Sequence, residues 1–153
     1  MNSLSQTRPR LLLALYTGLL LYGTLWPFQF TSHPGRNTTN VKRHVEWIPF
    51  TRLCPNHGLF CPRDTGLNLA MFLPFGALAA LISTTGVGRM RPIVRAAAFG
   101  FSLSLLIETT QYFIPVRYPS TTDLLLNTVG AGLGGLIVFT ISRTMPLNVP
   151  HQP

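Results

Sequence analysis

Acidic side chains are scarce in this sequence: its 153 residues include only Glu46, Asp64, Glu108 and Asp123. Charged residues make up 10% of the chain and hydrophobic residues 46%, whereas an ordinary soluble domain is about one quarter charged. So low a charge content disfavours a surface in contact with water and favours a lipid bilayer. The length fits one domain, which we take as residues 1–153.

The basic residues do not form a nucleic-acid-binding pattern. The chain has 12 Lys plus Arg and a net charge of +8, but these cations are scattered singly between apolar runs. A stripe of Lys and Arg interleaved with aromatic residues is missing, so we expect no nucleic-acid partner. Cations beside membrane spans, facing anionic lipid headgroups, explain the charge more simply.

Common catalytic and phosphate-binding motifs are also missing. The sequence contains no G-x-S-x-G, no H-E-x-x-H and no G-x-x-x-x-G-K. No histidine falls within a long apolar run, which excludes a Ser–His pair inside a membrane. We therefore expect no cofactor and no metal, and we favour a protein that is not an enzyme.

Four apolar runs dominate what is present, at residues 11–28, 67–85, 93–114 and 122–142. Each approaches the ~20 residues that a helix needs to cross the hydrocarbon core of a bilayer. The pattern predicts an all-α integral membrane bundle of four transmembrane helices, with a long loop between the first two. A secretory signal peptide is the alternative for the first run, but its apolar core exceeds the usual ~7–15 residues.

The arginines suggest an orientation. Six basic residues would lie on each side of the membrane, but one set is crowded at the ends of the spans: Arg8, Arg10, Arg89, Arg91, Arg95 and Arg143. The positive-inside bias acts at these positions. We therefore expect a multi-pass protein with both termini in the cytoplasm and the long loop outside, with its apolar segment 45–50 lying on the membrane.

Polar and small residues recur at helical spacing along three of the runs. One face of the third run carries Gly100, Ser104, Glu108 and Gln111. The matching sets are Asp64, Asn68, Gly76 and Ala80 on the second run, and Asp123, Asn127, Gly130 and Gly134 on the fourth. The small residues predict a close packing seam, and the acids and amides should meet in one layer near the outer face.

Each polar residue also has a purely structural interpretation. Glu108 would lie about two turns inside its helix, where an acid usually marks a functional path, but it could instead only fasten helices. Asp123 follows Ser120 in an S-x-x-D pattern that is typical of a capping box. Arg117 is either the partner of these acids or an interfacial anchor.

The two cysteines lie close together in the long loop, as CPNHGLFC from Cys54 to Cys61. In an outward-facing loop they could form a disulfide, and free thiols are the alternative. A zinc site would need His57 and one more histidine, and the spacing fits no familiar zinc pattern.

Taken in order, several motifs resemble those of the VanZ-like family of small bacterial membrane proteins. The first run ends in WPF, and WIPF is similar to the family's NLIPF segment with Trp47 in place of Asn. Three further segments are similar to the family's later motifs: LNLAMFLPFG, SLLIETTQYFIPVR and DLLLNTVGAGLGGL. The family's recurrent polar positions fall on Asn68, Glu108, Gln111, Arg117, Asp123 and Asn127.

The resemblance implies a protein of the bacterial cytoplasmic (inner) membrane that is related to the cell envelope, and it implies no reaction. A family member is linked to low-level resistance to teicoplanin, a lipoglycopeptide. Our hypothesis is an outward-facing polar pocket that binds a lipid headgroup or an amphipathic ligand, such as a lipid-linked envelope precursor or a lipoglycopeptide. In it, Arg117 would hold an anionic group, and the amides of Asn68, Gln111 and Asn127 would form hydrogen bonds.

Two alternatives remain open. The first is a membrane-embedded enzyme acting on a lipid-linked envelope precursor, with Glu108 and Asp123 as acid and base. The second is a structural subunit whose polar seam docks onto a larger envelope assembly.

Overall fold

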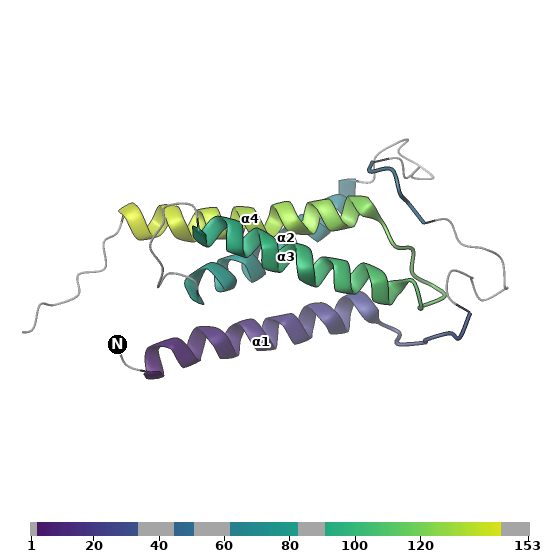
Figure 1. Cartoon of the computed structure of the whole chain (residues 1–153), viewed down its shortest axis with the longest axis horizontal. Helices are drawn as coiled ribbons and strands as arrows, with labels where there is room; N and C mark the ends of the chain where they lie inside the picture. The colour runs from purple at the N-terminus through teal and green to yellow at the C-terminus, as the bar shows by residue number, and fades with distance from the viewer. Residues whose placement is uncertain (1–2, 34–44, 51–61, 83–90, 145–153) are drawn as a thin grey trace, which may run out of the picture.

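The computed structural model describes residues 3–33, 45–50, 62–82 and 91–144. These residues form four helices and no strand: α1 (Ser3–Leu25), α2 (Pro62–Ile82), α3 (Arg91–Gln111) and α4 (Thr121–Thr144). The helices lie side by side along the long axis of the molecule (Figure 1). The prediction of an all-α fold with four helices is confirmed.

Two helices are long and apolar enough to cross a membrane, α3 from Pro92 and α4 over its full length. The apolar part of α2, Gly66–Ile82, is shorter, and α1 includes Arg8 and Arg10 within its helical length. Length and composition in the described residues therefore support two of the four predicted spans.

The end of α3 differs from the predicted run in a way that changes the position of Glu108. This helix ends at Gln111 rather than at Ile114, and Phe113 and Ile114 instead donate backbone hydrogen bonds three residues back, to Thr110 and Gln111. Pro115 explains the end, because a residue before proline is sterically disfavoured in the helical conformation. Glu108 therefore lies in the last turn of α3 and not two turns inside it.

The other boundaries also differ: every helix begins before its predicted run, α4 ends after it, and α1 and α2 end before it. α1 begins at Ser3 and ends at Leu25, and α4 ends at Thr144. α2 begins at Pro62, where a proline fits because the first helical N–H has no partner within the helix. α2 also continues through Pro74, so this proline does not interrupt the helix.

The core lies where α2 meets its neighbours. Its buried side chains are Leu20, Phe72, Phe75, Ile107 and Ala131. In the described part of the chain, α1 contacts α2 and α3 but not α4, whereas α4 packs along both α2 and α3. The Tyr16 hydroxyl adds a polar tie between helices by donating to the backbone oxygen of Met71 over 2.8 Å.

Glycines set the close approach of α2 and α4. A Cβ atom at Gly130 or Gly134 would overlap the backbone carbonyl of Leu69 or Leu73 on α2, and one at Gly76 would overlap the backbone of Ala131. Only glycine permits backbones to come so near. The packing seam predicted from the small residues is therefore confirmed.

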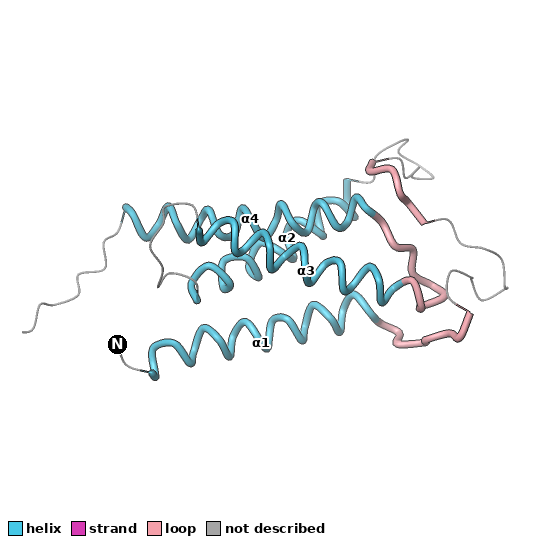
Figure 2. Tube along the Cα trace, viewed as in Figure 1, coloured by secondary structure: helices cyan, strands magenta, loops and turns pink. Residues whose placement is uncertain are grey.

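All the described loops gather at one end of the bundle, opposite the N-terminus (Figure 2). The ends of α1 and α3 and the starts of α2 and α4 meet there, together with residues 45–50. The polar residues predicted from the sequence fall in this half of the molecule, which we call the loop end.

Candidate functional site

Ser120 caps the N-terminus of α4. Its carbonyl accepts the backbone N–H of Leu124 over 3.2 Å, and its Oγ atom accepts the N–H of Thr122 over 3.1 Å. Both bonds are those of an N-cap residue, which satisfies backbone groups that the helix leaves without partners. The sequence predicted Ser120 at this position.

Glu108 reaches this cap from α3. Its Oε2 atom accepts the backbone N–H of Ser120 over 2.8 Å, and its side chain is only 9% exposed. In a capping box, the third residue of the same helix supplies that acceptor, and here it comes from a different helix. Glu108 thus joins α3 to α4 at the loop end.

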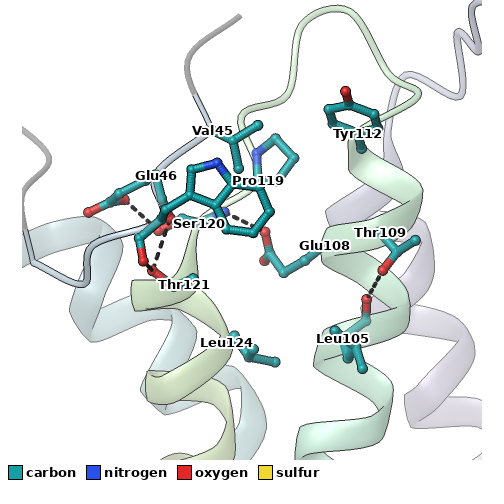
Figure 3. Close-up of a pocket in the computed structure, with 11 residues that line it drawn as sticks. Val45, Glu46, Leu105, Glu108, Thr109, Tyr112, Pro119, Ser120, Thr121 and Leu124 are labelled. Atoms are coloured by element: carbon teal, nitrogen blue, oxygen red, sulfur yellow. Dashed lines mark hydrogen bonds between the residues drawn. The ribbon is translucent and has the colours of Figure 1, made fainter. Parts of the chain in front are cut away.

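Glu46 reaches the same cap from the segment 45–50. Its backbone forms a parallel bridge with Ser120, with Glu46 N–H donating to Pro119 and Thr121 N–H donating back to Glu46. The carboxylate accepts the hydroxyls of Ser120 and Thr122, the latter over 3.0 Å. Two carboxylates from distant parts of the chain therefore meet at Ser120 (Figure 3).

The start of α4 explains where the few acids of this chain are placed. Asp123 lies in the first turn of α4, so three of the four acidic residues surround one helix N-terminus. The positive end of the helix dipole stabilises negative charge at this position. The side chain of Asp64 is outside the described residues.

A cavity of about 540 Å³ opens beside the two carboxylates, between α3, α4 and the segment 45–50. It is lined by Val45, Glu46, Trp47, Leu105, Glu108, Thr109, Tyr112, Pro119, Ser120, Thr121 and Leu124. Figure 3 shows Glu108 pointing toward Ser120, with Leu105 and Thr109 along α3 and Tyr112 just past the end of this helix. The volume is that of a small-molecule site.

Polar and apolar residues line different parts of the cavity. Carboxylates and hydroxyls lie near the cap of α4, and Leu105 and Leu124 lie one turn further into the bundle. Trp47 and Tyr112 add aromatic surface and are 76% and 38% exposed. This arrangement fits a ligand with a polar head and an apolar tail.

Two of the predicted site residues, Gln111 and Arg117, bind the end of α1. Gln111 Nε2 donates to the backbone oxygen of Thr24 over 3.0 Å. The guanidinium of Arg117 donates to the backbone oxygens of Gly23 and Trp26, over 2.9–3.3 Å. These bonds satisfy carbonyls at a helix C-terminus, where a cation is also favoured by the helix dipole.

The remaining three predicted residues, Asn68, Asp123 and Asn127, do not line the cavity. Asn127 is buried at 4% exposure and donates from Nδ2 to Ser104 Oγ over 2.9 Å, while its Oδ1 atom is buried without a partner. Asn68 is partly buried on α2, and Asp123 is partly buried on α4. Of the six predicted residues, only Glu108 lines the cavity.

Sequence reasoning missed Glu46, Thr121 and Trp47 as cavity residues. The signal for Glu46 was present, since it is one of only four acids and immediately precedes the apolar stretch WIPF. Its pairing with Ser120 joins residues far apart in the chain, which spacing along one helix does not reveal. Cys54 and Cys61, the predicted disulfide pair, lie outside the described residues.

Residues 13–142 match the VanZ/LLP1 family, so the chain belongs to this family. No curated protein and no solved structure matches the chain.

Proposed function

We propose that this chain is a multi-pass protein of the bacterial cytoplasmic membrane that binds an amphipathic molecule in the cavity at its loop end. The observation that carries the proposal is the cavity itself, with polar groups at the cap of α4 and apolar groups deeper along α3 and α4. Family membership supports a membrane setting, and lipids or lipid-linked envelope molecules are the ligands available there.

The outer surface of the bundle supports all four helices as spans. Large apolar side chains are exposed on all four helices, among them Leu12, Leu15 and Leu19 on α1, Leu67 and Leu81 on α2, Phe99 and Leu106 on α3, and Val129, Leu136 and Ile141 on α4. A soluble monomer rarely exposes so extensive an apolar surface, whereas lipid covers it without cost. At ~1.5 Å per residue, helices of this length match the ~30 Å hydrocarbon core.

Charged and aromatic residues support the proposed orientation. Exposed arginines stand at the end that carries the N-terminus, namely Arg8, Arg10, Arg95 and Arg143. The loop end carries aromatic side chains suited to the headgroup region, including Trp26, Phe28, Trp47 and Tyr118. We place the arginine end in the cytoplasm and the cavity at the outer leaflet.

This arrangement changes the ligand contacts expected from the sequence. Arg117 and Gln111 hold the end of α1, so we assign the ligand's polar head to Glu46, Glu108 and the hydroxyls near them. Leu105 is 45% exposed and lines the cavity, so it offers the tail a path from the polar head toward the surrounding lipid. A link to glycopeptide resistance would follow if the bound molecule were an envelope precursor or a lipoglycopeptide.

The proposal can be tested by filling the cavity. The protein is purified in an uncharged detergent, and bound lipid is counted by native mass spectrometry. Leu105→Trp should abolish the binding of one lipid, because the larger ring occupies the space for the tail. Leu106→Trp is the matched control, since Leu106 is 56% exposed on the same helix but does not line the cavity. Equal lipid binding by both variants would contradict the proposal.

A further inference from the structure

We propose that residues 45–50 form a strap over the cavity, which a ligand must displace to enter, and that the hydroxyl of Thr122 holds this strap closed. The inference rests on the proposed function, because it concerns entry to the same cavity. Val45, Glu46 and Trp47 of the strap line the cavity, whereas Thr122 does not. Figure 3 shows Val45 and Glu46 beside the start of α4, at the loop-end side of the cavity.

Hydrogen bonds from successive hydroxyl groups attach the strap to the start of α4. Ser120 Oγ donates to the carboxylate of Glu46. Thr121 Oγ1 donates to the backbone oxygens of Glu46 and Trp47, over 2.9 and 3.1 Å. These partners on α4 are small polar side chains, so water can replace the hydrogen bonds that the strap loses when it moves away.

Thr122 contacts the strap at two points with a single hydroxyl group. Its Oγ1 atom donates to Oε1 of Glu46 over 3.0 Å and accepts the backbone N–H of Phe50 over 2.8 Å. Glu46 lies near the start of the strap, and Phe50 is its last residue. The hydroxyl therefore fixes the strap near both of its ends from a position outside the cavity lining.

Opening the strap should cost little apolar burial. Trp47, Ile48 and Phe50 are large but 76%, 68% and 46% exposed, and none of them belongs to the buried core. The hydrogen bonds to α4 would be exchanged for bonds to water, and the net value of each such exchange is small. Aromatic rings also suit the headgroup region that an open strap would reach. The closed and open positions should therefore be close in free energy.

The backbone of Phe50 also favours opening. Its φ angle is 62°, in the left-handed region that a bulky side chain rarely adopts. Such a conformation costs free energy and persists only where surrounding contacts enforce it. The bond from Phe50 N–H to Thr122 is one of these contacts, so its loss would allow the backbone to relax.

The test measures access to the cavity without any ligand. In a chain whose Cys54 and Cys61 are replaced by serine, Leu124→Cys introduces a single thiol at a partly buried position that lines the cavity. The protein is placed in bilayer discs and treated with a charged methanethiosulfonate reagent, which does not enter lipid. The rate of modification then reports how often the strap is open.

Three substitutions connect this rate to the hydroxyl. Thr122→Val keeps the shape of the side chain but loses both hydrogen bonds to the strap, so modification at position 124 should become about tenfold faster. Thr122→Ser retains a hydroxyl and should restore a rate close to the original one. Thr128→Val is the matched control, since the Thr128 hydroxyl binds only the backbone oxygen of residue 124 within α4, and it should leave the rate unchanged.

A second cysteine position separates opening of the strap from loosening of the whole fold. Leu125→Cys lies on the same helix, is 44% exposed and is outside the cavity lining, so its rate should not respond to Thr122→Val. If Thr122→Val accelerates both positions equally, Thr121→Val decides, because it removes a different hydroxyl bound to the strap. Thr121→Val must then accelerate modification at 124 alone, or the proposal is overturned.

The proposal is also overturned if Thr122→Val does not accelerate modification at 124, or if Thr128→Val accelerates it as much. Neither result depends on lipid binding. The proposed function fails separately, if Leu105→Trp and Leu106→Trp bind lipid equally. The two failures are therefore distinguishable.

Discussion

Glu108, in the last turn of α3, accepts the backbone N–H of Ser120, the residue that caps α4, over 2.8 Å. The two residues are twelve positions apart in the chain, and the contact closes the turn that joins the helices. This hydrogen bond explains why one of the few acidic residues of the chain is buried. The same contact fixes one wall of the cavity.

Removing this contact should destabilise the bundle. Glu108→Ala leaves the Ser120 N–H without its acceptor and takes negative charge from the start of α4. A hydrogen bond to a charged group contributes ~1.5–3 kcal/mol, so we expect a loss of that size in the free energy of unfolding. Glu108→Gln should lose less, because it keeps an acceptor. Thermal unfolding in detergent measures both, and equal stability of wild type and Glu108→Ala would contradict this role.

The glycine seam predicts opposite effects for two similar substitutions. Gly134→Ala places a methyl group against the backbone of Leu73 and Ala77, and such overpacking costs ~1–3 kcal/mol. Gly18→Ala on α1 meets nothing within 4 Å, and alanine is favoured over glycine in a helix by ~1 kcal/mol. Unfolding temperatures should therefore fall for the first and not for the second. A stable Gly134→Ala would show that α2 and α4 are further apart.

Arg117 should hold the end of α1 in place. Arg117→Ala removes every hydrogen bond that its guanidinium donates to Gly23 and Trp26. We expect faster amide hydrogen exchange in the last turn of α1, and little change in the middle of α4. Arg117→Lys should restore part of the protection, because it keeps the charge but not the forked geometry. Unchanged exchange in Arg117→Ala would indicate that other contacts fix this end.

Ser104 and Asn127 should behave as a coupled pair. Ser104→Ala removes the acceptor of the Asn127 side-chain Nδ2 group, whose neighbouring Oδ1 atom is already buried without a partner. We expect the free energy of unfolding to fall by ~1–3 kcal/mol. Adding Asn127→Leu should recover much of this loss, since replacing both partners by apolar groups is often nearly neutral. A double-mutant cycle on unfolding free energies measures the coupling. Additive effects of the two substitutions would mean that the bond contributes nothing.

Spacing along single helices predicted much of this structure. Gly100, Ser104, Glu108 and Gln111 were placed on one face, and all four are buried. The small residues of α2 and α4 likewise pack where the pattern indicated. These features follow from the 3.6-residue period, which the sequence displays directly.

Contacts between distant segments could not be predicted in this way. Glu46 meets Ser120 because residues 45–50 fold back onto α4, and no periodicity links those positions. Arg117 was interpreted either as a partner of the acids or as an interfacial anchor, and its hydrogen bonds to the carbonyls of Gly23 and Trp26 could not be read from spacing. The shorter α3 was missed because the apolar run continues past its end, up to the residue before Pro115.

The proposed membrane-spanning bundle is tested most directly by determining which side of the membrane each end of the bundle occupies. Single cysteines at Tyr118, at the loop end, and at Thr144, at the opposite end, are introduced after Cys54 and Cys61 are replaced by serine. Both positions are exposed. With a membrane-impermeant maleimide on intact cells, we predict labelling at 118 and labelling at 144 only after lysis. Labelling of both positions from the same side, or of 118 only after lysis, would contradict a membrane-spanning bundle with its cavity at the outer face.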